Sequence, residues 1–198
     1  MKKRMTALLL SACMCAGLAG CGTNTPGNNP GHTKTDSSVT SLTDNITVTS
    51  VKTDITSFDQ LKNGINEFSM NMYSALPADE NIFYSPYSIA SALSMLDVGA
   101  GGTTKNELEN ALGITDLDKW NDEMKAYLSK DWSQNTFVNT ANSVWMNKGT
   151  TWAANINSDF LTPAKDYYSG EIYEADFDGQ ADKVVQNVNN WVSDNTNK

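Results

Sequence analysis

Residues that could carry out catalysis are few in this chain of 198 residues. His32 is the only histidine, and it lies in a segment rich in Gly, Asn and Thr that cannot bury enough apolar surface to order itself. A serine–histidine pair or a histidine-bound metal is therefore not expected in the folded part. The acidic residues form many pairs, but none has the spacing of a glycosidase or metal site. We therefore expect no cofactor and no metal in the folded part.

Cys21 follows a segment with the features of a secretory signal. Three basic residues at positions 2–4 precede an apolar run at 5–10, and small residues lead into Leu18-Ala19-Gly20-Cys21. The run is too short to span a membrane, which takes about 20 apolar residues. The ending resembles the bacterial lipobox, which implies removal of residues 1–20 and attachment of a diacylglycerol to Cys21. A plain signal peptide followed by a chance cysteine is the alternative.

An anchor at Cys21 implies a lipid bilayer as a partner and an exported location. Gly22 stands where an Asp would resemble an inner-membrane retention signal, which favours the cell surface or the outer membrane. Cleavage removes Cys13 and Cys15, so the mature segment can form no internal disulfide. It also leaves 11 basic residues against 23 acidic ones, a net charge of −12. This charge argues against a nucleic-acid partner.

Composition divides the chain into a signal at 1–20, a segment at 21–56 and an ordered part at 57–198. Residues 21–56 are dominated by Gly, Asn, Thr, Ser, Asp and Pro, and they predict a lipid-anchored flexible tether with room for one edge strand. Apolar spacing predicts the later elements. The expected helices cover 57–76, 86–98, 104–112, 115–132, 155–168 and 181–194, and the expected strands cover 82–84, 137–147 and 171–177. They do not alternate regularly, so the fold class is α+β.

Local signals mark the helix starts. Ser57 and Gln60 form a capping box, as do Thr104 and Glu107. In Ser85-Pro86 the hydroxyl can accept from amides of the first turn, and the missing proline N–H costs nothing there. A helix must therefore begin at residue 86.

The strand expected at 137–147 has two partly apolar faces. Val144 and Met146 fall on one side and Trp145 falls on the other, so layers should cover both faces. The strands beginning near Phe137 and Glu171 would also expose unpaired edges if nothing paired with them, and such edges promote aggregation.

Several motifs resemble those of the serpins, the serine protease inhibitor superfamily. They follow the family's order and approximate spacing over residues 57–198. The matching stretches are NIFYSPYSI at 81–89, SALSML at 91–96, GAGGTT at 99–104, ANSVW at 141–145, ADF at 175–177 and NNWV at 189–192 followed by Thr196. Each motif is weak alone, but chance explains their combined order poorly. One departure is Asn197, where the family usually has glycine.

The resemblance implies the N-terminal portion of the serpin fold, which is helices plus part of the large central sheet. The rest of that sheet, a second sheet and the reactive-centre loop would lie beyond Lys198, so the reactive centre is expected outside this chain. The resemblance also implies a suicide inhibitor that is not an enzyme and that is monomeric when complete. Its loop would be cut by a serine or cysteine protease and would then insert into the sheet of a metastable fold.

The resemblance further places Ser85 and Ser88 at the shutter, beneath strands that must part, and Asn189 on a helix in front of the sheet. Small polar groups suit this place because they can exchange hydrogen bonds as strands slide, without a steric clash. The residues alone also support plainer roles, with Ser85 as a helix cap, Ser88 as an ordinary first-turn residue and Asn189 as a surface amide.

Five tryptophans in an exported chain suggest an alternative function, a cell-surface adhesion or carbohydrate-binding lipoprotein built on a serpin-like scaffold. Trp145 and Trp191 fall on buried stripes, however, which favours core packing. Some serpins bind heparin through a basic cluster. Here Lys119, Lys125 and Lys130 lie among acidic residues, so we expect no heparin partner.

Overall fold

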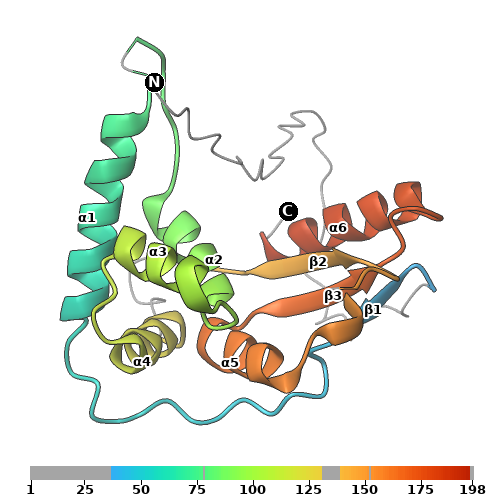
Figure 1. Ribbon diagram of the computed structural model, residues 1–198, viewed down its shortest axis with the longest axis horizontal. Coiled ribbons are helices and arrows are strands. Elements are labelled where there is room, and N and C mark those ends of the chain that lie inside the picture. The colour runs from blue at the N-terminus through green and yellow to red at the C-terminus, as the bar shows by residue number, and fades with distance from the viewer. Residues whose placement is uncertain (1–36, 78, 131–138, 152, 197–198) are drawn as a thin grey trace, which may run out of the picture. The chain divides into compact units, whose positions relative to one another are not determined.

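The computed structural model describes residues 37–77, 79–130, 139–151 and 153–196. The α+β class predicted from the sequence is confirmed (Figure 1). In chain order the elements are β1 (Val39–Ser41), α1 (Asp59–Ala75), α2 (Pro86–Asp97), α3 (Gly102–Leu112), α4 (Leu117–Leu128), β2 (Ser143–Asn147), a 3-10 turn (Ala153–Asn155), α5 (Ser158–Tyr168), β3 (Glu171–Ala175) and α6 (Ala181–Asn195). The expected signal peptide and Cys21 lie outside the described residues. Within those residues, no helix has the length and apolar character needed to cross a membrane.

The sheet has the strand order β1-β3-β2. β2 and β3 run parallel, with Trp145 opposite Tyr173. Parallel neighbours need a crossover connection, and α5 lies in the segment that joins them. β1 pairs antiparallel with the other edge of β3, where Val39 lies opposite Ala175.

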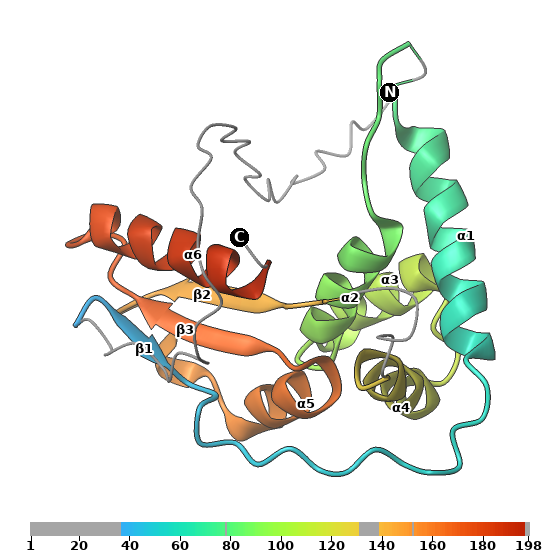
Figure 2. The same cartoon turned by 180° about the vertical axis from the view of Figure 1, so that it is seen from behind.

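Side chains of β2 alternate between two faces of the sheet. Val144 and Met146 pack against the larger apolar cluster, which the helices α1 to α5 supply. Trp145 packs on the other face in a smaller cluster that includes Tyr173 and Val184 of α6. Both views show α6 on one side of the sheet and α5 on the other (Figures 1 and 2). The prediction that layers cover both faces of this strand is confirmed.

The larger cluster contains fully buried side chains, among them Leu112, Trp120, Met124 and Tyr168. Gly64 of α1 packs directly against this cluster. A Cβ atom at this position would stand 2.5 Å from the Leu112 carbonyl oxygen and 2.7 Å from the Trp120 ring. Any larger residue would therefore push α1 away from α3 and α4, which explains the glycine inside this helix.

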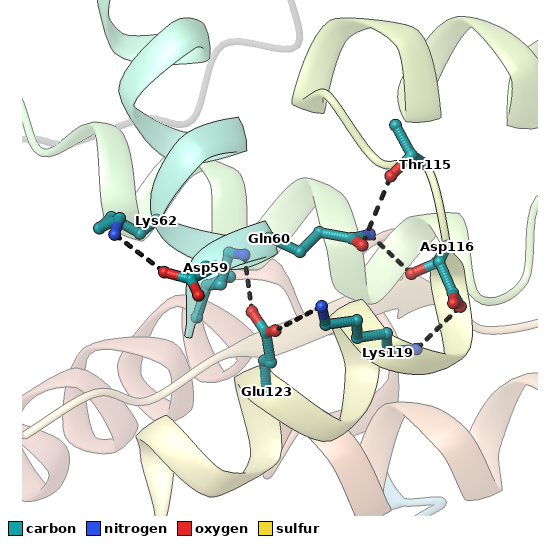
Figure 3. Close-up of polar contacts among 8 residues, drawn as sticks. Asp59, Gln60, Lys62, Thr115, Asp116, Lys119 and Glu123 are labelled. Carbon is teal, nitrogen blue, oxygen red and sulfur yellow. Dashed lines mark hydrogen bonds and ion pairs between the residues drawn. The ribbon is translucent and has the colours of Figure 1, made fainter. Parts of the chain in front are cut away.

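The first turn of α1 is held by α4 and not by its own capping box (Figure 3). Phe58 is the N-cap and makes no side-chain cap, so the capping box predicted at Ser57 and Gln60 is wrong. The Leu61 N–H instead donates to Glu123 Oε2 at 2.8 Å. The amide of Gln60 donates to the Asp116 carbonyl oxygen at 2.7 Å. A buried carboxylate from α4 thus satisfies an amide that a local cap would otherwise have served.

The segment before α1 belongs to the folded part from residue 39 onward, so the tether expected at 21–56 is wrong for this stretch. β1 joins the sheet, and the Leu42 N–H donates to the Ile172 carbonyl oxygen at 2.8 Å. Farther along, the Thr49 N–H donates to Asp166 Oδ1 of α5 at 2.6 Å. The sequence allowed one edge strand in this segment, and β1 is such a strand, but the contact of Thr49 with α5 was not predicted because its partner lies 117 residues away.

Other predicted elements are absent or end at different residues. The strand predicted at 82–84 is wrong, because residues 81–85 have no regular secondary structure and take no part in the described sheet. α3 starts at Gly102 without a side-chain cap, so the box at Thr104 and Glu107 is also wrong. α4 ends at Leu128, and within the described part of 137–147 only Ser143–Asn147 is a strand. α5 starts at Ser158, where Asn157 caps it.

Candidate functional site

The start of α2 is where Ser85-Pro86 predicts it. Ser85 has an extended backbone, and its Oγ accepts from the Ser88 N–H at 3.2 Å and from the Ser88 hydroxyl at 2.9 Å. Pro86 occupies the first helical position, where no N–H is needed. The helix-cap role of Ser85 is confirmed, and Ser88 is the third residue of the helix. Both side chains are exposed in the described part of the chain.

Two further serines, Ser91 and Ser94, follow Ser85 and Ser88 at intervals of three residues, so the four serines form a row along α2. Ser91 and Ser94 are fully buried. The Ser91 Oγ accepts from Asn142 Nδ2 at 3.0 Å. The Ser94 hydroxyl donates to the Ala90 carbonyl oxygen at 2.7 Å and accepts from Trp120 Nε1 at 3.0 Å. The small side chains let α2 pack closely, while every hydroxyl named here keeps a partner.

Asn142 ties α2 to the point where the two parallel strands begin. Its Nδ2 also donates to the Tyr168 backbone carbonyl oxygen at 3.4 Å. The backbone carbonyl oxygen of Asn142 accepts from the Glu171 N–H at 2.9 Å. The Tyr168 hydroxyl donates to Asn121 Oδ1. Burial raises the pKa of Tyr168 far above its usual value, so its hydroxyl stays protonated and can donate.

Sequence reasoning missed the buried half of this site, which is Ser91, Ser94 and Asn142. A signal was present in the serines at 85, 88, 91 and 94, whose spacing of three places them along one side of a helix. The partner of Ser91 lies 51 residues away, and no local pattern identifies such a contact.

Asn189 lies apart from the two serines. It is exposed on α6, which packs against the opposite face of the sheet from the larger cluster that α2 joins. Among the hydrogen bonds of the described residues, none joins Asn189 to Ser85 or Ser88. The shutter role of these three residues therefore stays a prediction.

The groups at this site are suited to holding elements together and releasing them. They are hydroxyls, amides, carbonyls and an indole N–H, so no ionised nucleophile or base is present among those described. No three His, Cys, Asp or Glu side chains in the described ranges gather closely enough to hold a metal ion. Such neutral bonds can be exchanged for others when neighbouring strands move.

The lysines considered for heparin binding have partners close by. Lys119 Nζ lies 3.8 Å from Glu123 Oε1, and Lys125 Nζ lies 2.8 Å from Asp166 Oδ1. Lys130 Nζ lies 5.8 Å from the centre of the Phe58 ring. A polyanion would have to compete with these contacts, and the absence of heparin binding stays a prediction.

Comparisons with known proteins give the family of this fold. The family model described as Serpin (serine protease inhibitor) matches residues 63–198. The chain belongs to the serpin family. A serpin-like protein of Thermococcus kodakarensis is 31% identical over 155 residues, which cover 72% of this chain and 35% of that protein. Neuroserpin of Gallus gallus is 36% identical over 143 residues, which cover 67% of this serpin chain and 33% of neuroserpin.

Solved serpin structures share the fold. The native state of tengpin, a thermophilic serpin, matches with a TM-score of 0.61 and 28% identity, and the match covers 80% of this chain and 40% of tengpin. The latent state of tengpin matches with a TM-score of 0.57 and 27% identity. This serpin chain spans about a third of the length of the curated relatives it matches. Its fold is therefore part of the serpin fold, as the sequence motifs predicted.

Proposed function

We propose that the protein containing this serpin segment is a suicide inhibitor of serine or cysteine proteases. The observation that carries the proposal is the family match over residues 63–198, on a chain whose mixed sheet lies between α6 and the helices that include α2. A loop can insert into a sheet as a strand only if the helices packed on that sheet can move to make room for it. The reactive-centre loop would be supplied by residues outside this chain.

The proposed reaction is an interrupted proteolysis. The Ser Oγ or Cys Sγ of the protease attacks the scissile carbonyl of the loop, the amine side leaves with a proton, and an acyl bond joins the loop to the protease. The cut loop then inserts as a strand and distorts the protease before water can cleave the acyl bond. The serpin supplies no catalytic group and no cofactor to this reaction.

Within this segment we assign the shutter role to Ser85 and Ser88. Support comes from their place at the start of the row that continues into the buried contact between Ser91 and Asn142. That contact links α2 to the strands, so hydrogen bonds along the row can be exchanged when the sheet rearranges. Asn189 on α6 would act on the opposite face of the sheet.

The experiment incubates the complete protein with a panel of serine and cysteine proteases. An inhibitor gives a complex that survives SDS and heat, together with loss of protease activity at close to equimolar ratio. Cleavage of the protein by every protease in the panel, with no such complex, would contradict the proposal. The segment 22–198 alone serves as the control and should form no complex, since we expect the loop to lie outside it.

We also propose export and lipid anchoring through Cys21, at the cell surface or the outer membrane. Support comes from the basic start, the apolar run and the small residues before the cysteine. Labelling cells with an alkyne-tagged fatty acid should label the wild-type protein and leave Cys21→Ser unlabelled. Equal labelling of both proteins would contradict the anchor. The bound lipid would join the protein to a bilayer while leaving the complete inhibitor a monomer.

A sugar-binding function is not favoured by the tryptophans that the structure describes. Trp120 is fully buried. Trp145 stacks on Tyr173 with the ring centres 4.3 Å apart, and the indole N–H of Trp191 is engaged by Glu171. These rings are used for packing, so we propose no carbohydrate site.

A further inference from the structure

One carboxylate oxygen joins α6 to the sheet beneath it. Glu171 Oε2, at the start of β3, accepts from Trp191 Nε1 of α6 at 2.5 Å. The same oxygen accepts from the Tyr173 hydroxyl, also at 2.5 Å. Hydrogen bonds to an ionised acceptor are roughly twice as strong as neutral ones. Glu171 therefore makes the strongest kind of polar contact between this helix and the sheet.

The neighbouring strand supports the carboxylate from the side. The Tyr173 ring stacks on Trp145 of β2, with centres 4.3 Å apart and planes 23° apart. Trp145 Nε1 donates to Ser143 Oγ at 3.0 Å, which holds its ring in place. Burial and the nearby Glu171 raise the pKa of Tyr173 well above its usual value, so its hydroxyl remains a donor. The aromatic pair thus orients Tyr173 toward Glu171.

Apolar contacts hold α6 only weakly. Val184 is its one buried residue among the 15 in the helix, and the outward Val185 and Val192 are exposed. The cluster under α6 contains three buried residues, compared with ten in the cluster on the other face. A helix with so little buried surface owes much of its attachment to polar contacts.

Apart from a local bond from the Lys183 ammonium to Gln180 just before the helix, the other described polar contacts of α6 with the rest of the fold are neutral. Asn187 Nδ2 donates to Ser38 Oγ at 3.3 Å, and Asn139 Nδ2 donates to the Asn195 carbonyl oxygen at 2.5 Å. These bonds are expected to be weaker than those made to the Glu171 carboxylate. The helix is therefore held at its C-terminal half mainly through Trp191.

We propose that Glu171 is a latch that sets how often α6 lifts from the sheet. Its release would uncover the face formed by Trp145 and Tyr173. In the complete protein this opening would regulate the rate of strand insertion, a part of the inference that rests on the proposed inhibitory function. The latch itself does not depend on that function.

Hydrogen exchange of the complete protein tests the latch directly. Glu171→Gln keeps the shape but removes the charge, and Trp191→Phe keeps a ring but removes the donor. Each change should speed exchange of the α6 amides about tenfold, since a bond to a charged group contributes more than a neutral bond. The double variant should be no faster than Trp191→Phe alone, because Glu171→Gln weakens the same bond that Trp191→Phe removes. Glu174→Gln, on the opposite face of β3, is the matched control and should match wild type.

Either of two exchange results in the single variants would overturn the latch. One is exchange of α6 within twofold of wild type in both single variants. The other is an equal rise throughout α4, which would mean that Glu171 stabilises the whole fold and not this helix. Additive effects in the double variant would likewise show that Glu171 and Trp191 do not act through one shared bond.

A second measurement separates the latch from the inhibitory function. The rate at which the SDS-stable protease complex forms should change at least threefold in Glu171→Gln and stay unchanged in Glu174→Gln. If wild type forms no complex with any protease, the proposed function fails while the exchange result still decides the latch. If exchange changes but complex formation does not, the latch exists and its regulatory role is rejected.

Discussion

Lys125 Nζ of α4 lies 2.8 Å from Asp166 Oδ1 of α5, and both residues are more than nine-tenths buried. Thr49 completes the contact, because its hydroxyl lies 2.5 Å from Lys125 Nζ and 2.8 Å from Asp166 Oδ2. Burial alone would raise the pKa of Asp166, but the Lys125 ammonium and the Thr49 donors outweigh it and hold this pKa below its usual value. The buried pair therefore joins two helices and the segment that leads into α1.

Replacing Asp166 by Ala should lower the free energy of unfolding of the complete protein by about 3 to 5 kcal/mol, because it leaves the Lys125 charge buried without its partner. Urea titration at pH 7 measures this loss. Thr49→Val removes only the neutral partner and should cost about 1 kcal/mol. A loss below 1 kcal/mol in Asp166→Ala would show that the pair does not hold the helices together.

The same pair predicts acid sensitivity. Since the pKa of Asp166 is lowered in the folded state, its contribution is complete above the unfolded value near 3.9 and is lost as the pH falls through the folded pKa. Urea titrations between pH 6 and pH 2 should show a steeper loss for wild type than for Asp166→Asn. Parallel curves for the two proteins would contradict this assignment.

Asp97 affects stability in the opposite direction to Asp166. It is fully buried at the end of α2, neither carboxylate oxygen has a hydrogen-bond partner, and Lys105 Nζ lies 3.8 Å away. Burial raises the pKa of Asp97. The ionised carboxylate therefore destabilises the folded state at pH values above this pKa, and the destabilisation disappears as the pH falls below it.

We expect Asp97→Asn to stabilise the complete protein by about 1 kcal/mol at pH 7, because it removes a poorly compensated buried charge. The gain should shrink in mildly acidic buffer, where the wild-type carboxyl takes up its proton. Asp54→Asn, at an exposed position, is the control and should leave the unfolding curve unchanged. Destabilisation in Asp97→Asn would mean that the Lys105 attraction outweighs the cost of burial.

Ser88 offers a test of the shutter. Ser88→Leu in the complete protein is expected to promote polymerisation or conversion to a latent form, because a bulky side chain would clash where strands slide. Native gels and inhibition assays measure both outcomes, and Ser88→Ala serves as the size control. A Ser88→Leu protein that stays monomeric and inhibitory would reject the shutter role.

Heparin should not activate the complete protein. The lysines near α4 already contact carboxylates, and the sequence carries an excess of acidic residues. Protease inhibition rates with and without heparin should therefore agree within twofold at low salt. A tight complex that weakens steeply as salt rises would contradict this expectation.

The segment 22–198 alone should fold poorly and aggregate. Phe83 is completely exposed, Met70 and Tyr73 of α1 are largely exposed, and the outer edge of β2 is unpaired among the described residues. Unpaired edges and exposed apolar side chains both promote association. Thermal unfolding monitored by circular dichroism and light scattering tests this, and a single cooperative transition of a monomer would show the expectation to be wrong.

Periodicity and local capping explain much of the fold before any tertiary contact is considered. The helix start at Ser85, the alternating faces of β2 and the α+β class depend on residues that are neighbours in sequence, so their patterns are visible there. The family motifs added the identity of the fold, because their order along the chain is itself a property of the sequence.

Tertiary structure decided the contacts that join distant segments. Glu123 satisfies an amide of α1 from 62 residues away, β1 orders because the edge of β3 is available, and Asn142 reaches the buried Ser91. The contact between Glu171 and Trp191 also arises only when α6 lies across the sheet. Local patterns cannot reveal these pairs, because a hydrogen bond depends on distance in space and any side chain of the right type has many candidate partners along the chain.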